Sequence, residues 1–152
     1  MKAAFYDTLI RQAEALLADE DDLIAAMANF SALINDNLPD LNWAGFYVVK
    51  NGVLVLGPFQ GKVACTRIEF GKGVCGTAAA SNKTQRVADV HQFEGHIACD
   101  AASNSEIVVP VRQHGQVIAV LDIDSPLLNR FDEDDQVGIE MLVKQFENCL
   151  FG

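Results

Sequence analysis

The sequence is poor in positive charge. It contains 11 Lys and Arg residues against 21 Asp and Glu residues, and its formal net charge at pH 7 is −10. A protein that binds nucleic acid usually presents a basic face to the phosphates, so this balance argues against a nucleic-acid partner. The acidic excess is otherwise typical of a protein that stays in solution.

Membrane and export signals are missing as well. No apolar run approaches the roughly 20 residues that a membrane helix needs, so we expect no membrane contact. The opening MKAAFYDTLIRQ lacks the basic end followed by an apolar block that marks a secretion signal. We therefore expect a cytoplasmic protein, in which cysteine thiols stay reduced.

Nucleotide-binding folds are disfavoured. The segment GKGVCG at 71–76 has the spacing GxGxxG, but no repeated βα pattern surrounds it, and the spacing of a Walker loop does not occur. Half of the residues are apolar and no segment is of low complexity, which excludes a disordered chain. With 152 residues, we expect a single domain over 1–152.

Apolar stripes of helical period are present at both ends of the chain. The first covers residues 5–17, and the second runs from Leu23 to Ile34 after the acidic run 19–22, which is suited to cap a helix. A last helix is predicted from about Glu133. Cys149 falls on its apolar stripe, so we interpret Cys149 as an inert core thiol.

Strand patterns fill the middle of the chain. Apolar runs at 43–50 and 53–56 flank Asn51-Gly52, and runs at 107–112 and 117–124 form a second predicted hairpin. Further strands are predicted at 66–70 and 85–90, a short helix at 74–80 and a long loop at 91–104. The pattern predicts an α+β fold, a largely antiparallel sheet with helices packed on one face.

Four side chains on the predicted strands are candidates for a pocket. Alternation puts Trp43 and Tyr47 on one face, where they either wall a pocket or pack as ordinary sheet residues. Asp122 and Asp124 share a face in the same way. If a pocket covers the two aspartates, their proximity raises the pKa of one of them, and the pair suits an ammonium group or a proton donation. If they lie at a solvated strand end, neither pKa is raised.

Glu106 begins the strand that pairs with the two aspartates. A hairpin with Arg112 opposite Val117 sets Glu106 opposite Ile123, away from the face of the aspartates. A bulge or an odd-length turn restores Glu106 to that face. The sequence leaves both registers open.

Three cysteines, Cys65, Cys75 and Cys99, lie in the central segment. A zinc site using them with His91 or His96 is disfavoured, because no CxxC pair is present. Isolated core thiols are one alternative, and a dithiol redox pair is another. Cys99 falls in the long loop and Cys75 in the first turn of a short helix, which lowers a thiol pKa, so the two rank equally as nucleophile.

The motifs as a set carry a resemblance to a known family. GKVACTR, GKGVCGT, GHIACDAAS, SEIVVPV and LDIDSP together resemble the signature of the free methionine-(R)-sulfoxide reductases, which are small GAF-domain enzymes. The likeness covers nearly the whole chain, through NWAGFYV to FDEDD. It implies a six-stranded antiparallel sheet, a homodimer, and reduction of free L-methionine (R)-sulfoxide. A small-molecule-sensing GAF module without catalysis is the alternative.

The resemblance also implies roles for the cysteines. Cys99 is implied to attack the sulfoxide sulfur and to become a sulfenic acid, which Cys65 resolves to a disulfide. Cys75 is implied to be an auxiliary thiol. An external dithiol, thioredoxin, is implied to reduce the disulfide, with no metal and no organic cofactor.

The remaining site residues come from the same resemblance. Glu106, Asp122 and Asp124 are implied to be polar substrate ligands, with Glu106 or Asp124 as the proton donor. Trp43 and Tyr47 are implied to wall the S-methyl end of the substrate.

Overall fold

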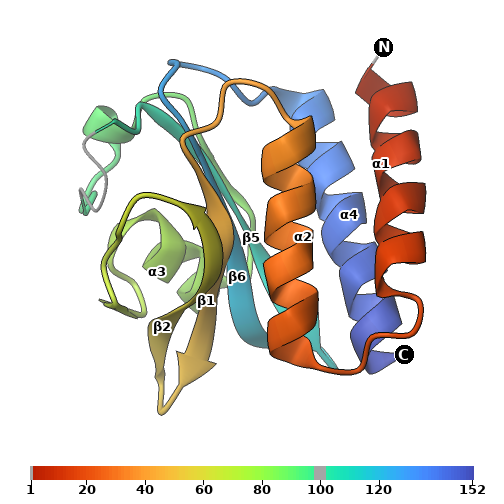
Figure 1. The fold of residues 1–152 in the computed structure, drawn as a ribbon. Helices are drawn as coiled ribbons and strands as arrows, with labels where there is room; N and C mark the ends of the chain where they lie inside the picture. Colours follow the sequence, from red (N-terminus) through yellow and green to blue (C-terminus); the bar gives the residue numbers. More distant parts are fainter. Residues whose placement is uncertain (1, 98–101) are drawn as a thin grey trace.

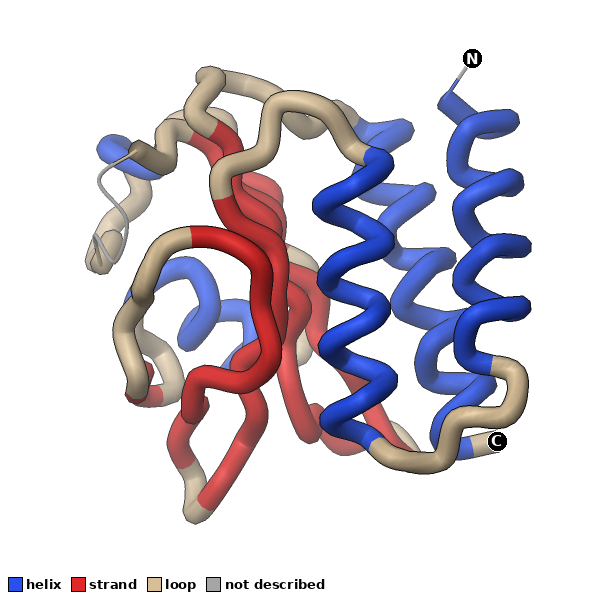
Figure 2. The backbone as a smooth tube through the Cα atoms, viewed as in Figure 1, coloured by secondary structure: helices blue, strands red, loops and turns tan. Residues whose placement is uncertain are grey.

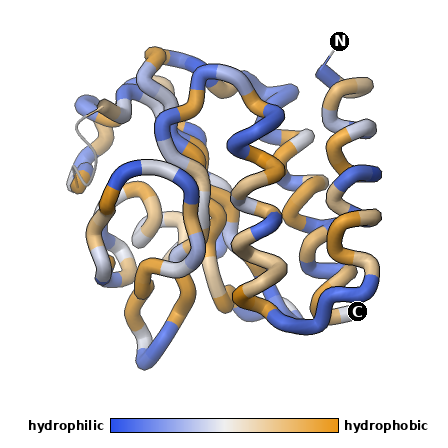
Figure 3. Tube along the Cα trace, viewed as in Figure 1, coloured by the Kyte–Doolittle hydropathy of each residue, from blue (hydrophilic) through white to orange (hydrophobic). Residues whose placement is uncertain are grey.

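The computed structural model describes residues 2–97 and 102–152. Three long helices pack together on one side of the sheet: α1 (Lys2–Leu17), α2 (Leu23–Asn37) and α4 (Glu133–Phe151) (Figure 1). Apolar and polar residues alternate around each of them (Figure 3), as expected for helices that bury one stripe. No helix in the described part of the chain carries an apolar stretch of membrane-spanning length.

Acidic side chains begin two of these helices. The Asp22 carboxylate accepts a hydrogen bond of 2.8 Å from the backbone N–H of Ala25, which confirms the cap predicted from the acidic run. At α4, Asp132 and Asp135 form a reciprocal capping box. Both arrangements satisfy N–H groups that have no partner inside the helix, and they place negative charge at the positive end of the helix dipole.

Six strands form one antiparallel sheet: β1 (Trp43–Lys50), β2 (Val53–Gly61), β3 (Arg67–Glu69), β4 (Gln85–Val87), β5 (Ser105–Gln113) and β6 (Gln116–Ser125) (Figure 2). Their order is β3-β2-β1-β6-β5-β4. The predicted α+β class and antiparallel sheet are confirmed. Asn51-Gly52 and His114-Gly115 both have positive φ at the two hairpin turns, as a two-residue turn with the twist of the strands requires.

The two faces of the sheet carry separate apolar cores. On the face of the long helices, Phe30, Phe46 and Phe146 meet with ring centroids 5.0–6.0 Å apart. The short helix α3 (Gly73–Ser81) packs on the opposite face, against strand residues such as Val108 and Val120. The predicted placement of helices on one face therefore holds for the long helices, while α3 covers the other (Figure 1).

A bulge in β6 fixes the register of the second hairpin. Arg112 pairs with Val117, but Val111 pairs with Ala119, so Ile118 is the extra residue. Ile118 consequently packs with the long helices and Val117 packs with the α3 side, the reverse of the predicted alternation for these two residues. From Ala119 onwards the predicted alternation is confirmed.

Candidate active site

Three carboxyl groups meet on the α3 side of the sheet because of this bulge. The register sets Glu106 of β5 directly opposite Asp124 of β6, and Asp122 lies two residues earlier on the same face. Of the two registers that the sequence left open, the bulged one is present. Glu106, Asp122 and Asp124 are all buried, with exposed fractions of 5–7%.

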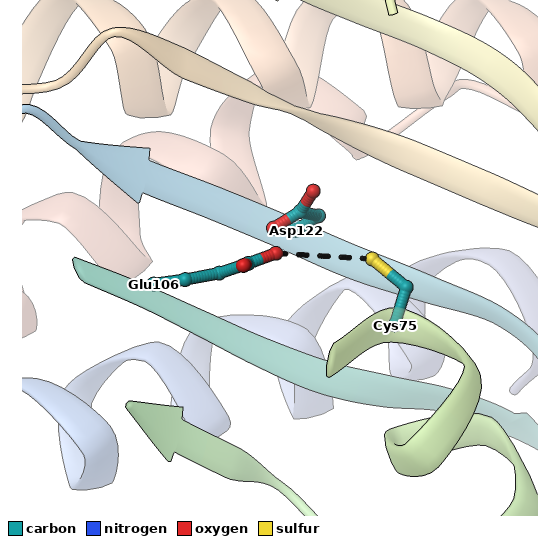
Figure 4. Close-up of side chains that lie close together, drawn as sticks. All are labelled: Cys75, Glu106 and Asp122. Carbon is teal, nitrogen blue, oxygen red and sulfur yellow. Dashed lines mark hydrogen bonds between the residues drawn. The ribbon is translucent and has the colours of Figure 1, made fainter. Parts of the chain in front are cut away.

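Cys75 completes this cluster from the helix above. Its Sγ lies 4.0 Å from Oε2 of Glu106 and donates a long hydrogen bond to it. Figure 4 shows Cys75, Glu106 and Asp122 converging from α3, β5 and β6. The Sγ atom of Cys75 and one carboxylate oxygen each of Glu106 and Asp122 all lie within 4.8 Å of one another. Sequence positions more than 30 residues apart are thus brought into one small polar group.

The three acidic groups of the cluster raise one another's cost of ionisation. Burial raises the pKa of Asp122, and the neighbouring charge of Asp124 raises it further. Burial also raises the pKa of Asp124, and Glu106 adds to that effect. The Oδ1 atoms of both aspartates have no hydrogen-bond partner, and within the described residues no carboxyl of the cluster belongs to an ion pair. The predicted rise of pKa in a covered aspartate pair is confirmed in direction.

The Cys75 thiol is held in its protonated form. Its side chain is only 4% exposed, and burial is the main reason that its pKa is raised, followed by the charge of Glu106. The prediction that the first turn of a helix lowers the pKa of Cys75 is therefore wrong in direction. Desolvation and a nearby carboxylate outweigh the dipole of a helix of nine residues.

A stack of aromatic rings lies beside the site, and Tyr47 is its member that faces the cavity. Tyr47 stacks on Trp43 at 5.8 Å, and Trp43 stacks on Phe59 at 5.0 Å. A Cβ on Gly45 would lie 2.2 Å from Cβ of Phe59, so glycine is required for this stack. The Tyr47 hydroxyl donates a hydrogen bond of 3.0 Å to the carbonyl of Cys65, which ties the stack to the segment carrying that cysteine.

A cavity with about 400 Å³ of atom-free space, part of it open to solvent, lies over the carboxyl cluster. Tyr47 lines the cavity, whereas Trp43 is not among its lining residues and stacks on Tyr47. The predicted carboxyls and Cys75 also line it.

Sequence reasoning missed two polar residues of the cavity. Ser103 donates a hydrogen bond of 3.2 Å to Oδ2 of Asp124 and accepts one of 3.0 Å from the Asn42 side chain. Nothing in the sequence pattern marks this serine. Lys72 also lines the cavity, and the run Gly71-Lys72-Gly73 before a helix was the available signal for it.

The other predicted site cysteines are placed differently. Cys65 is disulfide-bonded, while Cys75 and Cys149 carry free thiols. Cys149 is partly buried against the core under the long helices, as predicted. Cys99, the predicted nucleophile, lies outside the described residues. Within the described part of the chain, the compact group of metal-ligand side chains is the one around Cys75, and it contains neither His91 nor His96.

Comparisons with known proteins show the family of this chain. Residues 4–150 match the family model of the GAF domain. The chain is 56% identical over 149 residues to the free methionine-R-sulfoxide reductase of Escherichia coli K12, covering 98% of this chain and 90% of that protein.

Solved structures give the same result. The structure of fRMsr of Staphylococcus aureus in complex with substrate has a TM-score of 0.92 and 54% identity, and the match covers 95% of each chain. The free methionine-R-sulfoxide reductase of Neisseria meningitidis in complex with its substrate has a TM-score of 0.94 and 46% identity, over 98% of this chain and 90% of that one. The chain therefore belongs to the free methionine-(R)-sulfoxide reductase family of GAF domain proteins.

Proposed function

We propose that this protein reduces free L-methionine (R)-sulfoxide to methionine. The observation that carries the proposal is the buried cluster of Glu106, Asp122 and Asp124, which faces a cavity and takes part in no ion pair among the described residues. Relatives named as free methionine-R-sulfoxide reductases, at up to 56% identity over nearly the full chain, support it.

Recognition of the free amino acid follows from the charge of the site. A buried carboxylate is costly unless a cation pairs with it, and the α-ammonium group of methionine sulfoxide supplies one. Asp122 is the residue proposed to receive it, because its Oδ1 has no partner. A peptide-bound sulfoxide has no such charge at that position, so the same cluster favours the free amino acid over a protein substrate.

Activation of the sulfoxide follows from the raised pKa of the aspartates. A sulfoxide sulfur becomes electrophilic when its oxygen is protonated or strongly hydrogen-bonded. Asp124, whose pKa is raised by burial, is able to hold a proton near neutral pH and to donate it to that oxygen. Glu106 lies opposite Asp124 and is the alternative donor.

The thiol steps are assigned by family resemblance. The Cys99 thiolate attacks the sulfur, the S–O bond breaks, and the oxygen passes to Cys99 as a sulfenic acid while methionine leaves. The Cys65 thiol then forms a disulfide with Cys99 and releases water, and an external dithiol reduces the disulfide. The disulfide-bonded state of Cys65 supports its role in this pair, and the raised pKa of Cys75 argues for an auxiliary role.

Two partners complete the proposal. Thioredoxin is proposed as the external dithiol, because regeneration by exchange needs a second protein dithiol and no organic cofactor. A homodimer is proposed from the same resemblance. Light scattering at several protein concentrations would measure the mass of the particle directly, and a monomer at all concentrations would refute the dimer.

The test is a single-turnover assay with the reduced protein. Free methionine (R)-sulfoxide should yield about one methionine per protein, and the N-acetyl derivative should yield little, because acetylation removes the ammonium charge. Cys99→Ser should abolish the yield, and Cys149→Ser, which changes a thiol outside the cavity, should not. Binding of the free sulfoxide without any methionine would instead support the non-catalytic sensor.

A further inference from the structure

We propose that Cys75, Glu106 and Asp122 form a site for one zinc-type divalent cation inside the cavity. The site goes beyond the proposed reaction, which uses no metal. Binding of the metal is independent of the proposed function. The inference that the bound metal competes with the substrate rests on the proposed function.

The geometry already brings the donor atoms near the arrangement that a metal needs. The three atoms lie within 4.8 Å of one another, and the pair formed by Cys75 Sγ and Glu106 Oε2 is separated by 4.0 Å. Zinc bound to sulfur at about 2.3 Å and to oxygen at about 2.0 Å holds its ligands roughly 3–4 Å apart. Side-chain rotations that move the donor atoms by roughly 1 Å therefore bring them to the distances that a bound ion needs.

A second observation concerns two buried carboxyl oxygens at the site. The Oδ1 atoms of Asp122 and Asp124 are buried and have no hydrogen-bond partner, although each residue is less than one-tenth exposed. Buried oxygens in this state are normally paired with a donor or a metal. Asp122 is one of the three proposed ligands, and Asp124 lies two residues along the same strand face.

The donor set selects the class of metal. A thiolate combined with carboxylates suits zinc and similar borderline or soft cations, whereas calcium takes 6–8 oxygen ligands and magnesium keeps several waters. Binding replaces the proton of the Cys75 thiol with the metal and releases that proton to solvent, so no electron transfer is involved. A fourth position remains for water.

Occupancy of this site has a consequence for the substrate. Asp122 is the proposed partner of the α-ammonium group, and the two cations cannot share one carboxylate in a buried cavity. Zinc should therefore act as a reversible inhibitor that competes with free methionine sulfoxide.

The test uses cobalt(II) as a spectroscopic substitute for zinc, added to the fully reduced protein. We expect a thiolate-to-metal charge-transfer band and the intense visible bands of a four-coordinate site. The bands should saturate at one cobalt ion per chain, and added zinc should remove them by displacing the cobalt. Cys75→Ser and Asp122→Asn should each weaken binding by at least about tenfold. Cys149→Ser is the matched control and should bind as the unaltered protein does.

A wild-type measurement keeps the test decisive if a variant misfolds. X-ray absorption at the zinc edge should show one sulfur and several oxygen neighbours. The absence of a sulfur neighbour, more than one sulfur, or a charge-transfer band that persists in folded Cys75→Ser would overturn the proposal.

A competition arm separates this site from the proposed reaction. L-methionine should displace cobalt if Asp122 binds the ammonium group. If cobalt binding depends on Cys75 but L-methionine has no effect, the metal site is upheld and the assignment of Asp122 in the proposed function fails.

Discussion

At the scale of single residues, the carboxyl cluster opposes the stability of the fold near neutral pH. An acid whose pKa is higher in the folded than in the unfolded state binds more protons when folded. Its favourable contribution is therefore complete below the unfolded pKa, near 4, and is lost as the pH rises through the folded value. Asp122 and Asp124 both have this sign.

Asp122→Asn should remove part of this penalty. We expect the variant to gain stability over the unaltered protein as the pH rises from about 4 to 8, because asparagine carries no charge that the fold must bury. Chemical denaturation at several pH values measures this gain. Asp21→Asn, an exposed change, should shift stability by less than about 0.5 kcal/mol at every pH. A variant that is less stable at pH 8 would show that Asp122 is already paired.

The two free thiols should differ in reactivity. Cys75 is 4% exposed and its pKa is raised, so iodoacetamide should modify it slowly at pH 7.5, because the thiolate is the reacting species. Cys149 is only partly buried and should react faster. Peptide mapping over time measures both rates in one sample. Faster labelling of Cys75 would contradict its burial between α3 and the sheet and restore it as a candidate nucleophile.

At the scale of elements, the junction of α1 and α4 depends on one glycine and one buried acid. The Tyr6 hydroxyl donates a hydrogen bond of 2.7 Å to Asp135, which also accepts from Lys2 at 2.8 Å. The Tyr6 ring lies flat against Gly138, where a Cβ would come within 2.2 Å of the ring. The first and last helices are thus joined by contacts between distant parts of the chain.

Gly138→Ala should therefore destabilise the protein. Helix propensity alone favours alanine over glycine by about 1 kcal/mol, but the clash with Tyr6 should reverse the sign and cost roughly 1–3 kcal/mol. Val137→Ala, at the adjacent exposed position, is the control and should cost less than about 0.5 kcal/mol. Thermal and chemical denaturation measure both. A stabilised Gly138→Ala variant would mean that α1 moves away without penalty.

At the scale of the whole molecule, ligand binding and folding are linked through the same cavity. L-methionine, the proposed product, retains the ammonium group and should bind only the folded state. A concentration of about 100 times the dissociation constant stabilises by about 2.7 kcal/mol, which for a domain of this size raises the melting temperature by several degrees.

N-acetyl-L-methionine at the same concentration should produce a much smaller shift, because it lacks the positive charge. Thermal unfolding with each compound and without either measures the difference. Asp122→Asn should reduce the shift caused by L-methionine. Equal shifts from both compounds would show that the carboxyl cluster does not recognise the amino group.

The sequence by itself determined the type and order of the long helices and the strands, because their signals are local. The predicted strand 85–90 is shorter in the structure, where it ends at Val87 and a 3-10 helix follows at Val90–Gln92. Apolar stripes at helical spacing, the Asn51-Gly52 turn and the acidic cap at Asp22 each act through neighbours a few residues apart. The set of site motifs likewise sufficed to indicate the family. The polarity of β6 from Ala119 onwards could also be predicted, since alternation along one strand is a local property.

Only the tertiary structure decided which of these residues meet. No pattern in the sequence marks Ile118 as the extra residue of a bulge. The bulge nevertheless sets Glu106 opposite Asp124, because a one-residue change of register moves every side chain to the other face. The state of Cys75 also depends on distant groups: burial between α3 and the sheet and the charge of Glu106 outweigh the helix dipole that its sequence position suggested. Desolvation and charge proximity depend on three-dimensional packing, and local sequence patterns do not encode them.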